Sequence, residues 1–114
     1  MNAVFVELPA FERYRAHYLD DSGFASLQQF LMAKPEAGAV IEGTGGLRKL
    51  RFADARRGKG KRGGLRVIYY WWSGGSEFWL FTLYGKDEAA DLDPRQRRLL
   101  KAMVKTELEA RSGK

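Results

Sequence analysis

The sequence predicts an α+β fold in which residues 1–114 form one domain. The expected order is an N-terminal strand, two helices, an antiparallel β-meander and a C-terminal helix. A chain of 114 residues with 45% hydrophobic residues is long enough for one core and too short for two. Apolar residues recur at helical spacing near both ends of the chain. Between them, three apolar segments are separated by glycine-rich links, which is typical of an antiparallel meander.

The first third of the chain predicts a strand followed by two helices. Val4 to Val6 is a short β-prone segment, and Pro9 is suited to the first turn of a helix. Asp20 to Gly23 has the turn and N-cap chemistry of a second helix start. Pro35 should end that helix, since the residue before a proline is biased away from helical angles. Phe11, Tyr14 and Tyr18 recur at helical spacing in the first helix, and Phe24, Leu27 and Leu31 lie on one face of the second.

The middle of the chain predicts the meander. We expect residues 35–46 to be an irregular connection, and Leu47–Ala53 to be a strand with Leu50 and Phe52 facing a core. Lys49 and Arg51 then stand side by side on the opposite face. Leu65–Trp72 is apolar on both faces after Arg66, which favours a central strand. Residues 73–76 form a tight hairpin link, and Phe78–Tyr84 is the last strand.

The C-terminal helix has a strong predicted start. Asp93 supplies the N-cap, Pro94 the first helical position, and Gln96 the third residue of a capping box. We expect an apolar stripe to pack on the sheet. Its members are Leu99, Leu100, Met103, Val104 and Leu108.

The charge pattern indicates a polyanionic partner. The net charge is +6, the pI is about 9.8, and nine cations between Arg48 and Arg66 face one acid, Asp54. Such a concentrated charge is typical of a nucleic-acid-binding domain. The expected phosphate-binding cations are Arg48 and, in the glycine-rich segment 55–64, Arg56, Arg57, Lys59, Lys61 and Arg62.

The composition also excludes several classes of protein. There are no cysteines, so disulfides and thiolate metal sites are excluded. We identify no signal peptide and no apolar segment long enough to span a membrane, and we expect a cytoplasmic protein without membrane contact. The G-x-G-x-x-G match at 58–63 leads into a strand and therefore does not fit a dinucleotide-binding motif.

The candidate chemistry is RNA cleavage without a metal or cofactor. The absence of cysteine excludes a Cys-His arrangement, the single histidine, His17, is interpreted as an ordinary helix-surface residue, and no acid pair is placed as a dyad or metal cage. RNA supplies its own nucleophile, the 2′-OH. Arg51 and Arg66 could neutralise the phosphorane, while neighbouring arginines disfavour the protonated form of Lys49 and favour a general-base role. Tyr84 and Lys86, at the end of the last strand, complete the candidate catalytic set. These patterns alone support RNA binding and leave cleavage open.

The segments GLRKLRF, KRGGLRVIYYW and TLYGK, together with the order of elements, resemble the RelE/ParE superfamily of bacterial toxins. The likeness covers nearly the whole chain and is nearest to the HigB-like members of the RelE family. It implies the toxin of a type II toxin–antitoxin pair that cleaves mRNA in the ribosomal A site. It also implies a cognate antitoxin, of the HigA-like kind with a helix-turn-helix domain, through which alone the pair would contact operator DNA.

The resemblance assigns the family's basic catalytic positions to Lys49, Arg51, Arg66 and Lys86, and its aromatic position near the end of the last strand to Tyr84. Arg51 departs from the family pattern, since RelE-type members usually have a lysine there, and the segment after Lys86 departs from it as well. Asp87 stands where RelE-type toxins have an arginine, and Asp91 and Leu92 stand where they have a tyrosine. These departures leave the general acid unassigned.

Two alternatives to a nuclease remain. A gyrase-poisoning toxin of the ParE kind would share the fold, and a non-catalytic RNA-binding module would share the charge.

Overall fold

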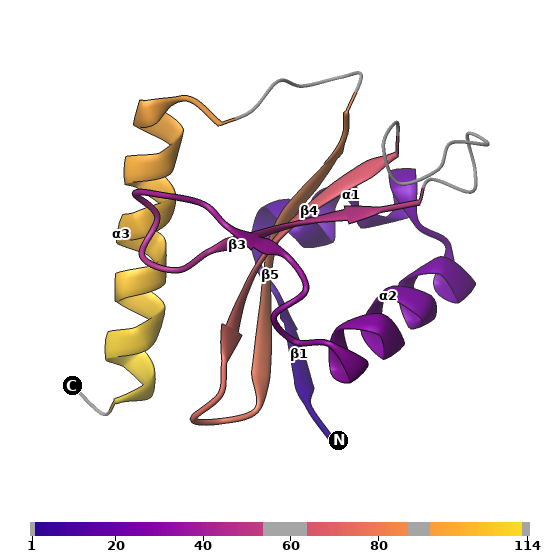
Figure 1. Cartoon of the computed structure of the whole chain (residues 1–114), viewed down its shortest axis with the longest axis horizontal. Coiled ribbons are helices and arrows are strands. Elements are labelled where there is room, and N and C mark those ends of the chain that lie inside the picture. The colour runs from indigo at the N-terminus through magenta and orange to yellow at the C-terminus, as the bar shows by residue number, and fades with distance from the viewer. Residues whose placement is uncertain (1, 54–63, 87–91, 113–114) are drawn as a thin grey trace.

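A computed structural model describes residues 2–53, 64–86 and 92–112, which form a five-stranded mixed sheet and three helices (Figure 1). The elements are β1 (Val4–Glu7), α1 (Pro9–Tyr18), α2 (Asp21–Ala33), β2 (Ala39–Val40), β3 (Arg48–Phe52), β4 (Leu65–Trp72), β5 (Glu77–Gly85) and α3 (Pro94–Arg111). The strand order is β1-β5-β4-β3-β2. The meander β3–β4–β5 is antiparallel, as predicted, and β1 adds to β5 in parallel.

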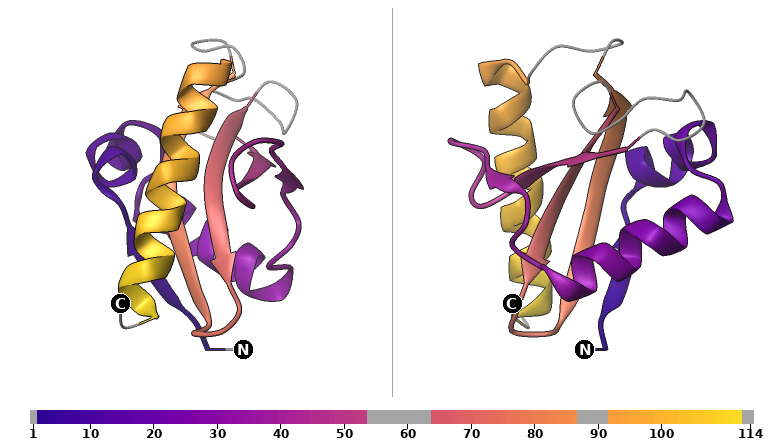
Figure 2. Two further views of the ribbon diagram at one scale, coloured as in Figure 1. Left: turned by 90° about the vertical axis from the view of Figure 1, so that its left-hand side faces the viewer. Right: turned by 45° about the vertical axis from the view of Figure 1, so that its right-hand side comes forward.

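The helices lie on both faces of the sheet. Helix α3 runs along one face, and α1 and α2 cover the other (Figures 1 and 2). Strand β4 is central, which explains why its sequence is apolar on both faces. Each face therefore has its own core.

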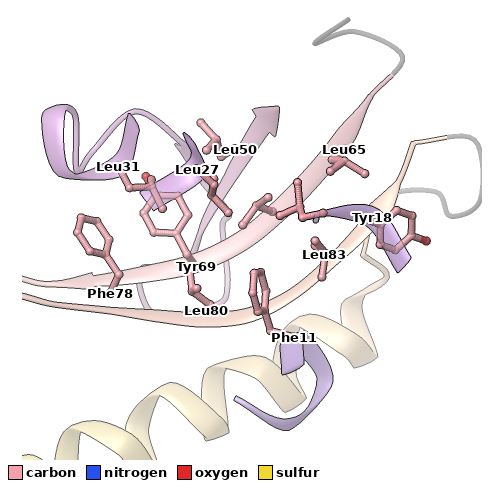
Figure 3. Close-up of a cluster of buried hydrophobic side chains, with 12 residues drawn as sticks. Phe11, Tyr18, Leu27, Leu31, Leu50, Leu65, Tyr69, Phe78, Leu80 and Leu83 are labelled. Carbon is pink, nitrogen blue, oxygen red and sulfur yellow. The ribbon is translucent and has the colours of Figure 1, made fainter. Parts of the chain in front are cut away.

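The core under α1 and α2 is the larger one. Phe11 of α1 and Leu27 and Leu31 of α2 meet Tyr69 and Leu80 of the sheet, and all five are buried (Figure 3). The core under α3 contains Leu47, Ile68, Trp79, Phe81 and Val104. Arg15 of α1 links β1 and α2 at the edge of the larger core. Its Nε donates to a carboxylate oxygen of Glu7 at 2.8 Å, and its guanidinium lies 4.4 Å from the centre of the Phe24 ring.

The helix starts follow their predicted caps. Asp20 accepts a hydrogen bond from the backbone N–H of Gly23 at 2.7 Å. Asp93 and Gln96 form a complete capping box, with reciprocal hydrogen bonds of 2.8 and 2.9 Å. Helix α2 ends at Ala33, two residues before Pro35.

Two predictions about these elements are wrong. The connection 35–46 is not wholly irregular, because Ala39 and Val40 form β2 and pair with Lys49 and Arg48. A two-residue edge strand is held by tertiary contacts and has no sequence pattern of its own. Leu99 is 64% exposed and does not belong to the apolar stripe of α3. It lies next to Leu100 on a helix, where neighbours point about 100° apart, and only Leu100 reaches the core.

Tyr69 fixes the path of the chain into β2. Its buried hydroxyl donates to the carbonyl of Pro35 at 2.8 Å and accepts from the N–H of Gly38 at 3.0 Å. Burial raises the pKa of this phenol. A side chain at position 38 would lie 2.9 Å from the Tyr69 ring, so only glycine allows this close approach.

No helix in the described part of the chain has both the length and the apolar character needed to cross a bilayer.

Candidate functional site

Four of the five predicted catalytic residues lie on the α3 face of the sheet. Arg51, Arg66 and Tyr84 are register partners across β3, β4 and β5 and form one row. Lys49 lies on the same face, two residues before Arg51, in a row with Ile68 and Thr82. Directly opposed residues in antiparallel strands have Cβ atoms about 4.5–5.5 Å apart. The row therefore brings the Cβ atoms of Arg51 and Arg66, and those of Arg66 and Tyr84, close together on a rigid sheet.

A β-bulge puts Tyr84 on this face. The β4–β5 register shifts between Ile68 and Tyr69, so that Ile68 pairs with Thr82 and Tyr69 pairs with Leu80, which leaves Phe81 as an extra residue. Strict alternation from Phe78, which faces α1 and α2, would send Tyr84 to that same face. With the bulge, Tyr84 packs against the α3 core instead and lies opposite Arg66.

The fifth residue, Lys86, lies just beyond the row. Its backbone N–H donates to the carbonyl of Gly64 at 3.0 Å, so the pairing of the two chain segments continues past the end of β5. The side chain of Lys86 is exposed. It can approach a ligand at the end of the sheet where β3 ends and β4 begins.

The four side chains on this face differ in exposure. Arg51 is exposed, Lys49 is half-buried, and Arg66 is only 6% exposed. Nη1 of Arg66 donates to the carbonyl of Leu65 at 3.2 Å, which helps to fix the guanidinium. The hydroxyl oxygen of Tyr84 is also buried. A ligand can therefore reach the site from β3, where Arg51 is exposed, whereas the Arg66 side chain and the Tyr84 hydroxyl on β4 and β5 are buried.

Two residues of the row carry like charges and face each other across a strand pair. Like charges directly opposed across a strand pair destabilise it, and Arg51 faces Arg66 in this way. Paired guanidinium groups are well suited to bind the oxygens of one phosphate, with geometric as well as electrostatic complementarity. A phosphate in this position would relieve the repulsion between them.

Arg48 is separated from these residues. It lies on the α1/α2 face opposite Tyr69. Its guanidinium donates to the carbonyls of Glu36 and Gly38 at 3.1 and 2.8 Å, and to the Glu36 carboxylate at 3.1 Å. These contacts give Arg48 a structural role in holding segment 35–38.

The predicted phosphate-binding loop lies outside the described residues. This applies to Arg56, Arg57, Lys59, Lys61 and Arg62, and also to the acids Asp54, Asp87, Glu88 and Asp91. Among the residues that the structure describes, no group of three or more acids and histidines could hold a metal ion.

The sequence interpretation assigned no role to the exposed cations of α3, which lies on the same face as the row. The sequence does contain a pattern that indicates them, because residues 94–105 have five cations and no acid. The sequence also did not predict that Thr82 lies on this face. Thr82 shares a row with Lys49 because of the bulge, and nothing in the sequence predicts the bulge.

No protein-family model matches this chain.

Proposed function

We propose that the protein is a metal- and cofactor-independent endoribonuclease, the toxin of a type II toxin–antitoxin pair resembling the RelE family and its HigB-like members. The observation that carries the proposal is the cross-strand row of Arg51, Arg66 and Tyr84 with Lys49 on the same face. Two arginines that face each other across a strand pair are suited to hold the oxygens of one phosphodiester.

The proposed reaction uses the substrate's own nucleophile. Lys49 accepts the proton of the 2′-OH, the 2′ oxygen attacks the adjacent phosphorus, and the bond to the 5′ oxygen breaks. Arg51 and Arg66 neutralise the additional negative charge of the phosphorane, and Tyr84 is the candidate to protonate the leaving 5′ oxygen. The products are a 2′,3′-cyclic phosphate and a 5′-hydroxyl end. Lys86, exposed at the end of the row, would hold a neighbouring phosphate.

The proposed setting is the ribosomal A site in the cytoplasm, where the mRNA is exposed for cleavage. The proposed partner is a cognate antitoxin with a helix-turn-helix domain, through which the pair would bind operator DNA. The predicted loop cations, from Arg56 to Arg62, would add phosphate contacts.

The decisive experiment adds purified protein to translating ribosomes and maps the RNA ends. We expect mRNA cut in a ribosome-dependent way, with cyclic phosphate ends, and with a rate unchanged by EDTA. Arg66→Gln should reduce cleavage by about 10²–10³-fold, the range found when one charge-stabilising donor is removed. Arg13→Gln, which alters an exposed cation of α1, is the matched control and should cleave normally. Intact mRNA with all preparations would refute the proposal, and a DNA-damage response with intact mRNA would favour gyrase poisoning.

One observation favours a second candidate, a non-catalytic RNA-binding module. The Arg66 side chain and the Tyr84 hydroxyl oxygen are buried, as structural groups would be. Such a module would stay toxic with Arg66→Gln and lose toxicity when Lys59, Lys61 and Arg62 are neutralised. A nuclease would lose toxicity in the first case.

A further inference from the structure

Four exposed cations lie along the outer side of α3. Arg95, Arg98, Lys101 and Lys105 follow one another at intervals of three or four residues, so they form one stripe on the helix. With a rise of 1.5 Å per residue, the stripe is about 15 Å long. We call these four residues the α3 basic face.

Acids are absent from this part of the helix. Residues 94–105 contain five cations and no acid, and the two acids of α3 are Glu107 and Glu109, near its end. Glu107 accepts a hydrogen bond from Arg111 at 2.8 Å. The charge of α3 is therefore concentrated in its first three turns.

This concentration destabilises the helix. Arg95, Arg97 and Arg98 lie in or next to the first turn, where the helix dipole disfavours positive charge. Like charges at i,i+3 and i,i+4 repel each other as well. Two arginines elsewhere in the described part of the chain are each paired with an acid, Arg15 with Glu7 and Arg48 with Glu36. The basic face is thus unfavourable for folding, and an anionic ligand would account for it.

The α3 basic face lies beside the loop that leads into β3. Cγ of Lys101 lies 3.6 Å from the position that a Cβ atom of Gly45 would occupy. Lys101, Lys105 and Gly45 also line one shallow surface pocket of about 240 Å³. The loop that contains Gly45 leads directly into β3, which places Lys49 and Arg51 on the same face of the sheet as α3. A ligand on the basic face could therefore extend toward the row.

We propose that the α3 basic face binds the sugar–phosphate backbone of base-paired RNA. The charge selects a polyanion. Helix α3 contains no aromatic residue, so it offers no platform on which unpaired bases could stack. Double-stranded RNA is recognised mainly through its phosphates and 2′-hydroxyls, which suits a straight row of cations. The proposal does not depend on whether the protein cleaves RNA.

The test compares two double variants that remove the same charge. Arg98→Gln/Lys105→Gln alters the basic face, and Arg13→Gln/Lys34→Gln alters exposed cations on the α1/α2 side. Both are made in an Arg66→Gln background, so that the RNA stays intact. Binding to a labelled RNA hairpin and to a single-stranded oligouridylate is measured by fluorescence anisotropy at several salt concentrations.

We expect the α3 double variant to bind the hairpin about tenfold more weakly. Its slope of log K against log salt should also be smaller by about 2, since two phosphate contacts are lost. The control double variant should change neither value, and oligouridylate binding should change less than hairpin binding. Equal weakening by both double variants would mean a net-charge effect and would overturn the proposal. Unchanged hairpin binding would also overturn the proposal. The same holds if the α3 double variant loses binding only to the single strand or only to an acidic antitoxin.

Thermal unfolding separates binding from folding. Glutamine is a good helix former, and removing like-charged neighbours should leave the melting temperature unchanged or raise it. Arg98→Lys/Lys105→Arg keeps the charge and should bind as the parent does. If this variant also fails to bind the hairpin, charge is not what the surface recognises, and the proposal is wrong. Because the assay contains no cleavage step, a failure of the proposed nuclease activity would leave this result unaffected.

Discussion

Arg51 and Arg66 lie directly opposite each other on β3 and β4, so two positive side chains share one position on the α3 face of the sheet. Their partner in the next strand is Tyr84. An opposed pair of like charges costs stability, and three strands hold it in place. In the proposed function, one phosphate would be bound by both side chains.

Arg51→Gln should stabilise the protein and reduce its activity. Removing one of two opposed charges should raise the free energy of unfolding by about 0.2–1 kcal/mol. The same change should slow mRNA cleavage, because one phosphate-binding group is lost. Urea denaturation and a cleavage assay measure the two effects, with Arg13→Gln as the control for net charge. A destabilised variant would show that Arg51 serves the fold.

Tyr84→Phe tests the proton donor. If the phenol protonates the leaving oxygen, cleavage should fall by about 10²–10⁴-fold. Substrate binding should change little, because the ring and its packing remain. Tyr70→Phe is a suitable control, since Tyr70 is packed against the same core and stacks on Trp79 with ring centres 4.9 Å apart. Normal cleavage by the Tyr84 variant would assign the proton to another group.

Tyr69→Phe should destabilise the protein without a direct effect on the site. The change removes a buried hydroxyl that bridges Pro35 and Gly38, and it leaves the Gly38 N–H without that acceptor. The expected cost is about 1–3 kcal/mol, measured by urea denaturation. Tyr14→Phe, at an exposed position of α1, should change the free energy of unfolding by less than about 0.5 kcal/mol.

The Glu77–Arg111 pair should make stability depend on pH. Arg111 Nε donates to the Glu77 carboxylate at 2.9 Å, as does Nε1 of Trp79, and these hydrogen bonds lower the pKa of Glu77 below its ordinary value of 4.5. A lowered pKa means that the unfolded chain takes up the proton first. The stabilisation is therefore complete above pH 4.5 and is lost as the pH falls through that value to the folded-state pKa.

Glu77→Gln should remove part of this acid dependence. We expect the melting temperatures of the variant and the parent to converge as the pH falls below 4.5, and to differ most near neutrality. The variant should also loosen the end of α3, because the Arg111 guanidinium, 4.4 Å from the centre of the Trp79 ring, is fixed partly by Glu77. Parallel melting curves at all pH values would show that the pair contributes nothing.

Much of the fold could be predicted because its determinants are local. Asp20, Asp93 and Pro94 indicate helix starts because they act on the backbone of adjacent residues. Strand β4 is apolar on both faces, which predicts its central position in the sheet. The predictions that were wrong concern features that depend on contacts between distant parts of the chain. Strand β2 exists because it pairs with β3, and Leu99 is exposed because α3 turns its neighbour Leu100 toward the sheet.

The candidate site divides in the same way. Alternation along one strand was enough to put Lys49 and Arg51 on one face, since side chains alternate with a period of two. The position of Tyr84 depended on the extra residue at Phe81, because the bulge moves each later side chain of β5 to the opposite face of the sheet. A bulge depends on how two strands fit together across the sheet, and neither strand encodes it alone. Local sequence patterns are thus enough to predict the elements and the basic character of the protein, whereas the fit of β4 against β5 in the folded sheet puts Arg51, Arg66 and Tyr84 in one row.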